Sequence, residues 1–381
     1  MKRPASAASS LSAGATKRRP AQSAHVVPFA LGALPIPAHF CNPEDPTRKN
    51  CKEMVSKLSA AELNCIQEKI NRLGDVVSVV GLCSGANCAT VQCGLLTEML
   101  NVGKVHDLAT CEVDKDKMAF AEFVVKTVGG QEEHCAFEDV LMFKKGAGSI
   151  GGVSNECIVH NKECRFPNGL IATCGYSCVN LSKQFNSKGG VTRDKCLEAL
   201  YVDRSGQTGQ TAGALMDVAN KARWPVLFWE NSDEKLKESN KDNYADFEVE
   251  AYRNGYANHG ELYCLADYGV PNGRKRSCGV QYEFQDCGIP YRLAKDLARS
   301  TCAMVLRFRT KPQLIADFLF ENSSPYVQFV LSQLEAVKGR KMEHEVIETD
   351  WPAKFGKMCK KEKILPSEPA GVLTSHVITP K

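Results

Sequence analysis

Strand-like and helix-like segments alternate along the central part of the chain, and this alternation constrains the fold more than any other feature. The β-branched run DVVSVVGLCSG (75–85) closes on a turn of small residues and precedes a helical pattern at 89–102. LATCEVD (108–114) precedes another helical pattern at 118–128, and WPVLFWEN (224–231) is a further strand-like run. Strands that alternate with helices predict a mostly parallel sheet with helices on both faces. We therefore expect an α/β fold.

The cysteine content and the lack of long apolar runs limit the class of protein. The 381 residues include 18 cysteines and carry a formal net charge of +4. The sequence lacks a run of the roughly 18 apolar residues that a membrane-spanning helix needs. Its first residues also lack the apolar core of a secretory signal. We therefore predict no membrane partner and a reducing compartment, in which the cysteines are thiols and most of them are core residues.

The first 45 residues differ in composition from the rest of the chain. They are rich in Ala, Ser and Pro and have no helical or strand period, which predicts a disordered basic tail. KRPA (2–5) and KRRP (17–20) form two basic clusters that resemble a bipartite nuclear localisation signal, so we expect a nuclear protein. A solvated tail and an organelle transit peptide are the alternatives.

A turn of small residues and an acidic residue mark the first candidate site. The turn GLCSGANC (81–88) follows the first strand, where open α/β sheets bind their ligands and where small residues let the backbone approach. Glu112 lies at the tip of the second strand, a position at which acidic residues commonly bind ribose hydroxyls. Together the two features favour an adenosyl or adenine-nucleotide ligand.

Later strand ends carry a thiol, a carboxyl group and two guanidinium groups. Cys178 follows the strand-like segment GLIATCGYSC and precedes a polar stretch, which makes its thiol accessible. Glu230 ends an apolar strand, where desolvation raises the pKa of a half-buried carboxyl and lets it donate a proton near neutral pH. Strand alternation after the turn in DYGVPNGRKR places Arg274 and Arg276 on one face, suited to a phosphate or a polarised carbonyl oxygen.

The types, order and spacing of these motifs resemble those of the cytosine-5 DNA methyltransferase family across residues 75–285. GLCSG resembles that family's cofactor loop, CEVD its ribose-binding acid, and FEDV (137–140) the strand tip that contacts adenine. GYSCVNLS resembles the nucleophile loop, WEN the catalytic glutamate motif and DYGVPNGRKR the late arginine motif. The resemblance implies a Rossmann-like class I S-adenosylmethionine-dependent methyltransferase. It implies these cofactor-binding residues: Leu82, Cys83, Ser84, Gly85, Glu112, Val113, Asp139, Val140 and Ser177.

The resemblance also implies a mechanism. Cys178 attacks carbon 6 of cytosine, so that carbon 5 can accept the methyl group of S-adenosylmethionine. Glu230 holds or protonates ring nitrogen 3, and Asn231 fixes the loop. Arg274 orients Glu230 or binds the base carbonyl, and Arg276 supports the cysteine loop or a nearby phosphate. A base in duplex DNA must be flipped out of the stack to be reached.

Several positions depart from the family pattern. Gly81 and Cys83 stand where the family has Asp and Phe, and Asn87 replaces a glycine. The nucleophile loop reads SCV (177–179) in place of Pro-Cys-Gln, and Asn272 replaces a glutamine. These changes put cofactor binding in question while leaving the reacting groups in place.

The region after the arginine motif is short for a target-recognition domain. FENSSPYV (320–327) matches the family's last motif poorly and is better explained as a surface turn. We therefore expect a partner protein to supply target recognition. The predicted organisation is a disordered tail (1–45), a helical lead-in (46–74), a catalytic domain (75–300) and a partly helical, then loosely ordered C-terminal extension (301–381).

The predicted function is cytosine-5 methylation of DNA, with two alternatives. RNA as substrate would use identical chemistry. A catalytically silent, nucleic-acid-binding regulatory protein would retain the fold with a decayed cofactor loop.

One further segment, CIVHNKEC (157–164), has metal-ligand spacing. Cys157, His160 and Cys164 could bind zinc, with Cys174 as a candidate fourth ligand. The motif is a single knuckle, whereas strong zinc signals show two, so the sequence predicts no metal site.

Overall fold

The computed structural model describes residues 46–74, 76–85, 87–126, 134–145, 153–181, 201, 204, 206–270 and 273–311. The predicted disordered tail, the loosely ordered part of the C-terminal extension with FENSSPYV, and Asn272 lie outside the described residues.

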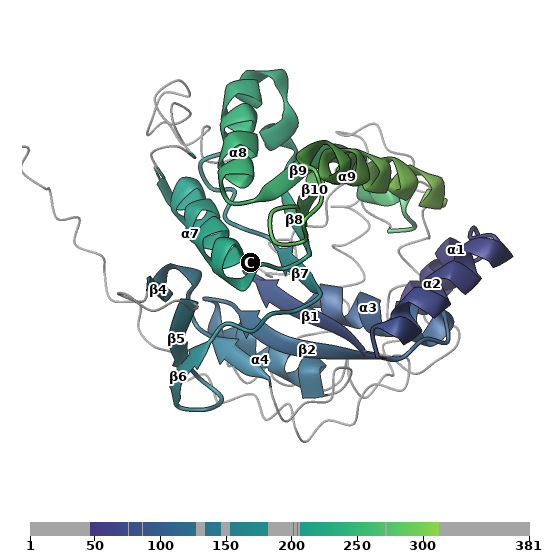
Figure 1. Ribbon diagram of the computed structural model, residues 1–381, viewed down its shortest axis with the longest axis horizontal. Helices are drawn as coiled ribbons and strands as arrows, with labels where there is room; N and C mark the ends of the chain where they lie inside the picture. The colour runs from purple at the N-terminus through teal and green to yellow at the C-terminus, as the bar shows by residue number, and fades with distance from the viewer. Residues whose placement is uncertain are drawn as a thin grey trace, which may run out of the picture. The chain divides into compact units, whose positions relative to one another are not determined.

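A seven-stranded sheet forms the centre of the fold, with the strands in the order β3-β2-β1-β7-β8-β10-β9 (Figure 1). The strands are β1 (Val76–Leu82), β2 (Lys104–Cys111), β3 (Cys135–Phe137), β7 (Ile171–Cys174), β8 (Val226–Ser232), β9 (Tyr256–Cys264) and β10 (Lys275–Glu283). The five neighbouring strands β3, β2, β1, β7 and β8 pair in parallel, and β10 is antiparallel to both of its neighbours, β8 and β9. The predicted mostly parallel α/β sheet is confirmed.

Helices cover both faces of this sheet because side chains alternate along its strands. Val80 and Leu82 of β1 belong to the large core that includes side chains of α7 and α8, whereas Val77 and Val79 pack with residues of α2 and α3 on the other face. The helices are α1 (Pro46–Val55), α2 (Ala60–Arg72), α3 (Cys88–Met99), α4 (Lys115–Val124), α7 (Gly206–Ala222), α8 (Lys241–Arg253) and α9 (Tyr291–Val305). Helices on both faces were expected and are found.

A small antiparallel sheet lies beside the β3 edge, and no sequence pattern predicted it. It consists of β4 (Lys144–Lys145), β5 (Val153–Cys157) and β6 (Lys162–Arg165), in that order. The amide N–H of Ile158, just after β5, donates to the carbonyl oxygen of Ala136 in β3 at 2.8 Å. This hydrogen bond joins the hairpin of β5 and β6 to the main sheet.

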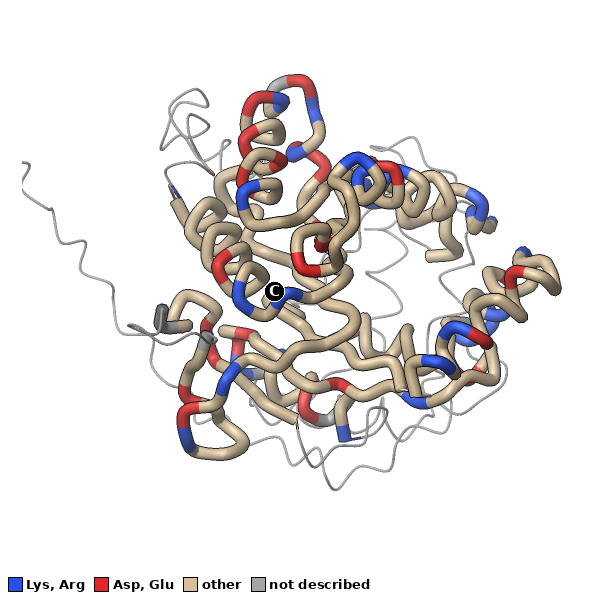
Figure 2. Tube along the Cα trace, in the orientation of Figure 1, with Lys and Arg blue, Asp and Glu red and all other residues tan. Residues whose placement is uncertain are grey.

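The edge strand β9 is covered on both faces. α8 and α9 both contact it, and both helices carry charges of either sign (Figure 2). Lys295 of α9 bonds with its ammonium group to the Glu248 carboxylate of α8 at 2.6 Å and to the carbonyl oxygen of Asn258 in β9 at 2.5 Å. These contacts protect an edge that could otherwise pair with another chain.

α9 runs through residue 300, where the predicted catalytic domain ends. Its side chains Ala294, Ala298 and Cys302 are buried at a spacing of four residues, and the last two pack with Val280 of β10. This apolar stripe makes α9 part of the sheet's core. No helix in the described part of the chain is long and apolar enough to cross a membrane.

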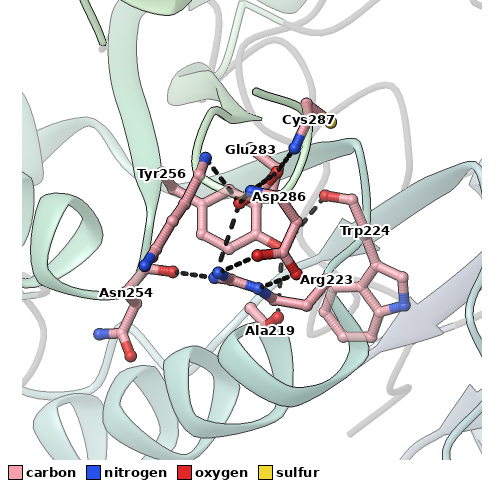
Figure 3. A network of polar contacts seen from close by, with 9 residues as sticks. Ala219, Arg223, Trp224, Asn254, Tyr256, Glu283, Asp286 and Cys287 are labelled. Carbon is pink, nitrogen blue, oxygen red and sulfur yellow. Dashed lines mark hydrogen bonds and ion pairs between the residues drawn. The ribbon is translucent and has the colours of Figure 1, made fainter. Parts of the chain in front are cut away.

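A polar network fixes the start of β8 and the end of β10 (Figure 3). Arg223 donates through Nε and Nη2 to Asp286 at 2.7 and 2.8 Å and through Nη1 to the carbonyl oxygen of Asn254 at 2.9 Å. The fully buried Glu283 carboxylate accepts backbone N–H groups of the following turn. Because Glu230 lies near the other end of β8, the network stabilises the sheet away from the candidate site.

Candidate functional site

The turn after β1 is tied to the tip of β2 by backbone hydrogen bonds. Cys83 and Gly85 adopt positive φ angles of 49° and 56°, which reverse the chain after Leu82. The amide of Ser84 donates to the carbonyl oxygen of Cys111 at 3.3 Å, and the amide of Gly85 donates to Glu112 Oε2 at 2.8 Å. A Cβ on Gly85 would meet nothing within 4 Å, so open space adjoins the turn at this residue.

Glu112 is buried and holds the turn from the second strand. Its Oε1 accepts the amide of Asp114 at 3.0 Å, so each carboxylate oxygen receives one backbone hydrogen bond. A carboxylate oxygen can accept more than one hydrogen bond, and acceptor capacity therefore remains for hydroxyl groups. Val113, directly beside it, is 66% exposed and offers an apolar surface.

The segment after β3 lies near the same turn. Asp139 caps the short 3-10 helix η4 (Val140–Met142), because its Oδ1 accepts the amide of Leu141 at 2.9 Å. Burial, together with the charges of Glu112 and Asp139, raises the pKa of Cys83 to about 12, so the three residues are neighbours. Val140 is buried in the core, which leaves its backbone rather than its side chain for ligand contact.

A buried polar cluster, which sequence reasoning missed, fixes the start of α3. Asn87 is left-handed with φ 53°, and its Nδ2 donates to Asp107 Oδ2 at 2.5 Å. The Thr90 hydroxyl donates to the same oxygen at 2.5 Å. Asn87, which departs from the family glycine, therefore joins the turn after β1 to Asp107 in β2.

The loop that carries Cys178 is held from two sides. Asn231 Nδ2 donates to the carbonyl oxygen of Tyr176 at 3.1 Å, while its Oδ1 accepts the amide of Ser232 at 2.8 Å. On the other side of Cys178, Asn180 and Thr208 of α7 exchange hydrogen bonds of 3.0 and 3.1 Å. The thiol thus lies on a loop with a fixed backbone.

The thiol, the carboxyl group and both guanidinium groups gather at this loop. Burial raises the pKa of Cys178, the charge of Glu230 raises it further, and the charge of Arg274 lowers it. Burial also raises the pKa of Glu230, whereas the charge of Arg274 lowers it. Arg276 Nε lies 2.6 Å from Glu230 Oε1 and forms an ion pair with it. The Arg276 side chain is 13% exposed and that of Glu230 is 47% exposed, so the carboxyl group is open to a ligand.

Gly175 connects this group to the cofactor turn. A Cβ at Gly175 would lie 3.4 Å from the carbonyl oxygen of Cys83 and 3.5 Å from Glu230 Oε2. The backbone of the turn after β1 and the Glu230 carboxylate therefore flank one exposed glycine. A ligand bound at the turn would lie close to a second ligand bound at Glu230.

A buried lysine supports the loop from the core and was not predicted, because SDEKLKESNKDN (232–243) has the pattern of a polar connection. Lys235 is only 1% exposed and lies 3.2 Å from the Phe247 ring centroid and 4.7 Å from those of Tyr176 and Tyr201. Its amine donates to the hydroxyl groups of both tyrosines. Burial lowers the pKa of Lys235 well below its usual value. The side chain of Tyr176 is thereby fixed two residues before Cys178.

The structure places most predicted site residues at one edge of the sheet. Asn231 contacts the cysteine loop, and Arg276 pairs with Glu230. The hydroxyl of Ser177 accepts the amide of Val179 at 3.4 Å and so takes part in the loop's own turn.

Comparisons with known proteins give only distant structural similarity. No protein-family model and no curated protein matches the chain. A protein described as a DNA modification methyltransferase encoded within an E. coli prophage is 12% identical, with a TM-score of 0.33 over 54% of this chain and 47% of that one. A DNMT2 variant from Spodoptera frugiperda is 11% identical, with a TM-score of 0.33 over 54% of this chain and 50% of that one.

A third solved structure is similar at the same level. A protein from Pyrococcus horikoshii, described as an RNA methyltransferase, is 12% identical, with a TM-score of 0.29 over 58% of this chain and 81% of that one. The chain thus matches about half the length of the first two structures. TM-scores this low carry no argument about function, which is therefore argued from the site itself.

Proposed function

We propose that the protein transfers the methyl group of S-adenosylmethionine to carbon 5 of cytosine in DNA through a covalent adduct at Cys178. The observation that carries the proposal is the gathering of Cys178, Glu230, Arg274 and Arg276 beside the turn after β1. Nuclear location and a partner that supplies target recognition are part of the same proposal.

The residues near the turn fit the cofactor. The turn Leu82–Gly85 has open space at Gly85, the Glu112 carboxylate has acceptor capacity for ribose hydroxyls, and Val113 is an exposed apolar contact. Asp139 and the backbone of Val140 would complete the adenine side, and Ser177 the side towards the thiol. When bound, S-adenosylmethionine supplies an electrophilic methyl group.

The protein's own groups would activate the base. The Cys178 thiolate forms a bond to carbon 6 and moves the ring electron pair to carbon 5, which becomes nucleophilic. The Glu230 carboxyl, whose pKa burial raises, donates its proton in a hydrogen bond to ring nitrogen 3 and so neutralises the charge that develops on the ring. Arg276 holds Glu230 through the 2.6 Å ion pair, and Arg274 opposes the rise in the pKa of Cys178. Carbon 5 then accepts the methyl group and gives up its proton to solvent, and the bond between sulfur and carbon 6 breaks, which restores the aromatic ring.

Covalent trapping tests this proposal. Fluorine at carbon 5 of a DNA cytosine cannot leave as a proton does, so we expect a stable adduct that requires S-adenosylmethionine. Cys178→Ala should abolish the adduct, whereas the control Cys287→Ser, at an exposed thiol after β10, should retain it. An adduct that survives Cys178→Ala would disprove the assignment of the nucleophile.

Two further measurements separate the alternatives. Methyl transfer to tRNA but not to DNA would replace DNA by RNA as the substrate. The absence of S-adenosylmethionine binding in calorimetry, together with the absence of an adduct, would favour a silent regulatory protein.

A further inference from the structure

Four metal-ligating side chains meet between the main sheet and the small sheet. Cys135 lies on β3, Cys157 ends β5, His160 lies in the turn that follows and Cys164 lies on β6. Their Sγ and Nδ1 atoms all lie within 4.8 Å of one another. Cys135 and Cys157 are buried, and the other two residues are partly exposed.

The distances match those around a tetrahedral metal ion. His160 Nδ1 lies 3.3 Å from Sγ of Cys157, 3.5 Å from Sγ of Cys164 and 3.6 Å from Sγ of Cys135. With Zn–S bonds of about 2.3 Å and Zn–N bonds of about 2.0–2.1 Å, a tetrahedral site has N···S edges of about 3.5 Å. All three observed distances lie within a few tenths of an ångström of that edge.

Hydrogen bonding alone does not account for this arrangement. A ring nitrogen of neutral histidine either donates or accepts a hydrogen bond along one direction. Three sulfur atoms nevertheless surround Nδ1 of His160 at similar distances. All three cysteines are free thiols. One ion at the centre would contact all four atoms at once.

We propose that Cys135, Cys157, His160 and Cys164 bind one zinc ion. Three sulfur ligands and one imidazole in tetrahedral geometry are typical of structural zinc, in which the protein supplies all four ligands and no position is left for a substrate. The inference does not depend on the proposed methyl transfer.

The position of the site indicates its role. Two ligands belong to the β5–β6 hairpin, a third lies in its turn, and Cys135 belongs to the edge strand of the main sheet. Apart from the ligands, the hydrogen bond of Ile158 to Ala136 and a group of stacked aromatic rings that includes Phe137 and Phe166 join the two sheets. The ion would therefore fix the small sheet to β3, whose next residues lead to Asp139.

The prediction that the chain has no metal site is therefore replaced by this proposal, and the candidate fourth ligand changes. Cys174 lies near Cys83 and Lys235 and does not belong to the group of clustered ligand atoms. Cys135 takes the fourth position because β3 runs beside β5, a pairing that the spacing within CIVHNKEC does not contain.

Metal analysis of the full-length purified protein tests the site directly. We expect about one zinc ion per chain, and we expect Co²⁺ added to chelator-treated protein to give the strong thiolate–cobalt absorption of a tetrahedral site. Cys157→Ser and His160→Ala should each remove the bound zinc. The control Cys65→Ser, at an exposed thiol on α2, should retain it.

His160 lies in a partly exposed turn, so His160→Ala keeps the test valid if Cys157→Ser fails to fold, with circular dichroism as the check of folding. Wild-type protein that is free of zinc and gives no cobalt spectrum would overturn the proposal. Zinc content equal to wild type in a folded His160→Ala variant would also overturn it.

Discussion

Replacement of Asn231 by alanine separates the role of this residue in the cysteine loop from its contribution to stability. Asn231 is 1% exposed, and its side chain donates to the carbonyl oxygen of Tyr176 and accepts from the amide and the hydroxyl group of Ser232. Asn258 on β9 is a matched control, because it is 2% exposed, accepts from Trp229 Nε1 at 2.8 Å and donates to the Tyr244 hydroxyl at 3.2 Å.

The structure gives a similar loss of stability for both variants. Each hydrogen bond contributes about 0.5–1.5 kcal/mol net, and a buried partner left unpaired costs about 1–3 kcal/mol. We therefore expect Asn231→Ala and Asn258→Ala each to lower the free energy of unfolding by about 2–4 kcal/mol. Urea denaturation followed by tryptophan fluorescence measures this change.

Only Asn231→Ala should change the chemistry of Cys178. A displacement of about 1 Å in a reacting group can lower the rate about 100-fold, so we expect adduct formation on 5-fluorocytosine DNA to slow by about 10- to 100-fold. The released loop should also let iodoacetamide reach Cys178 faster, as peptide mass spectrometry can measure. Equal adduct rates and equal alkylation rates in Asn231→Ala and Asn258→Ala would show that Asn231 does not position the loop.

Four further substitutions have expected outcomes. Gly175→Ala would place a methyl group in ordinary contact with the Glu230 carboxylate. We therefore expect an unchanged unfolding midpoint in urea and weaker covalent trapping of cytosine. Trapping equal to wild type would refute the proposed closeness of Gly175 to the bound base. Glu230→Gln removes a charge that raises the pKa of Cys178, and Arg274→Gln removes one that lowers it. Alkylation of Cys178 should therefore begin at lower pH in Glu230→Gln and at higher pH in Arg274→Gln. A pH shift of the same sign in both variants would contradict the electrostatics of the site. The pKa of Lys235 is lowered in the folded protein, so the unfolded chain binds more protons than the folded one. The free energy of unfolding therefore rises with pH up to the pKa of an ordinary lysine, by at most about 1.4 kcal/mol per pH unit. Lys235→Met should flatten this rise between about pH 7 and pH 8.5, below the ordinary pKa of cysteine, and denaturation curves with the same pH slope as wild type would refute the reasoning.

The local elements and the order of the motifs could be predicted from the sequence. The β-branched run of β1 and the apolar spacing of α2 report on backbone conformation over a few residues, and Gly74, with a φ angle of 86°, ends that helical segment as predicted. Glu230 could be identified as a candidate because an acidic residue at the end of an apolar strand is visible in the sequence. The antiparallel direction of β10 was not visible, since its pairing with β8 joins residues far apart in the chain.

The partners of the functional groups depend on contacts that form when the chain folds. Arg276 lies on the same face of the sheet as Glu230 because β10 pairs with β8 in one register, and Cys135 joins the CIVHNKEC cluster because β3 and β5 are neighbours. Lys235 has the sequence of a surface turn, yet it is buried among aromatic rings that come from four different segments. Periodicity records which face of an element is apolar; it does not record which distant side chain that face will meet.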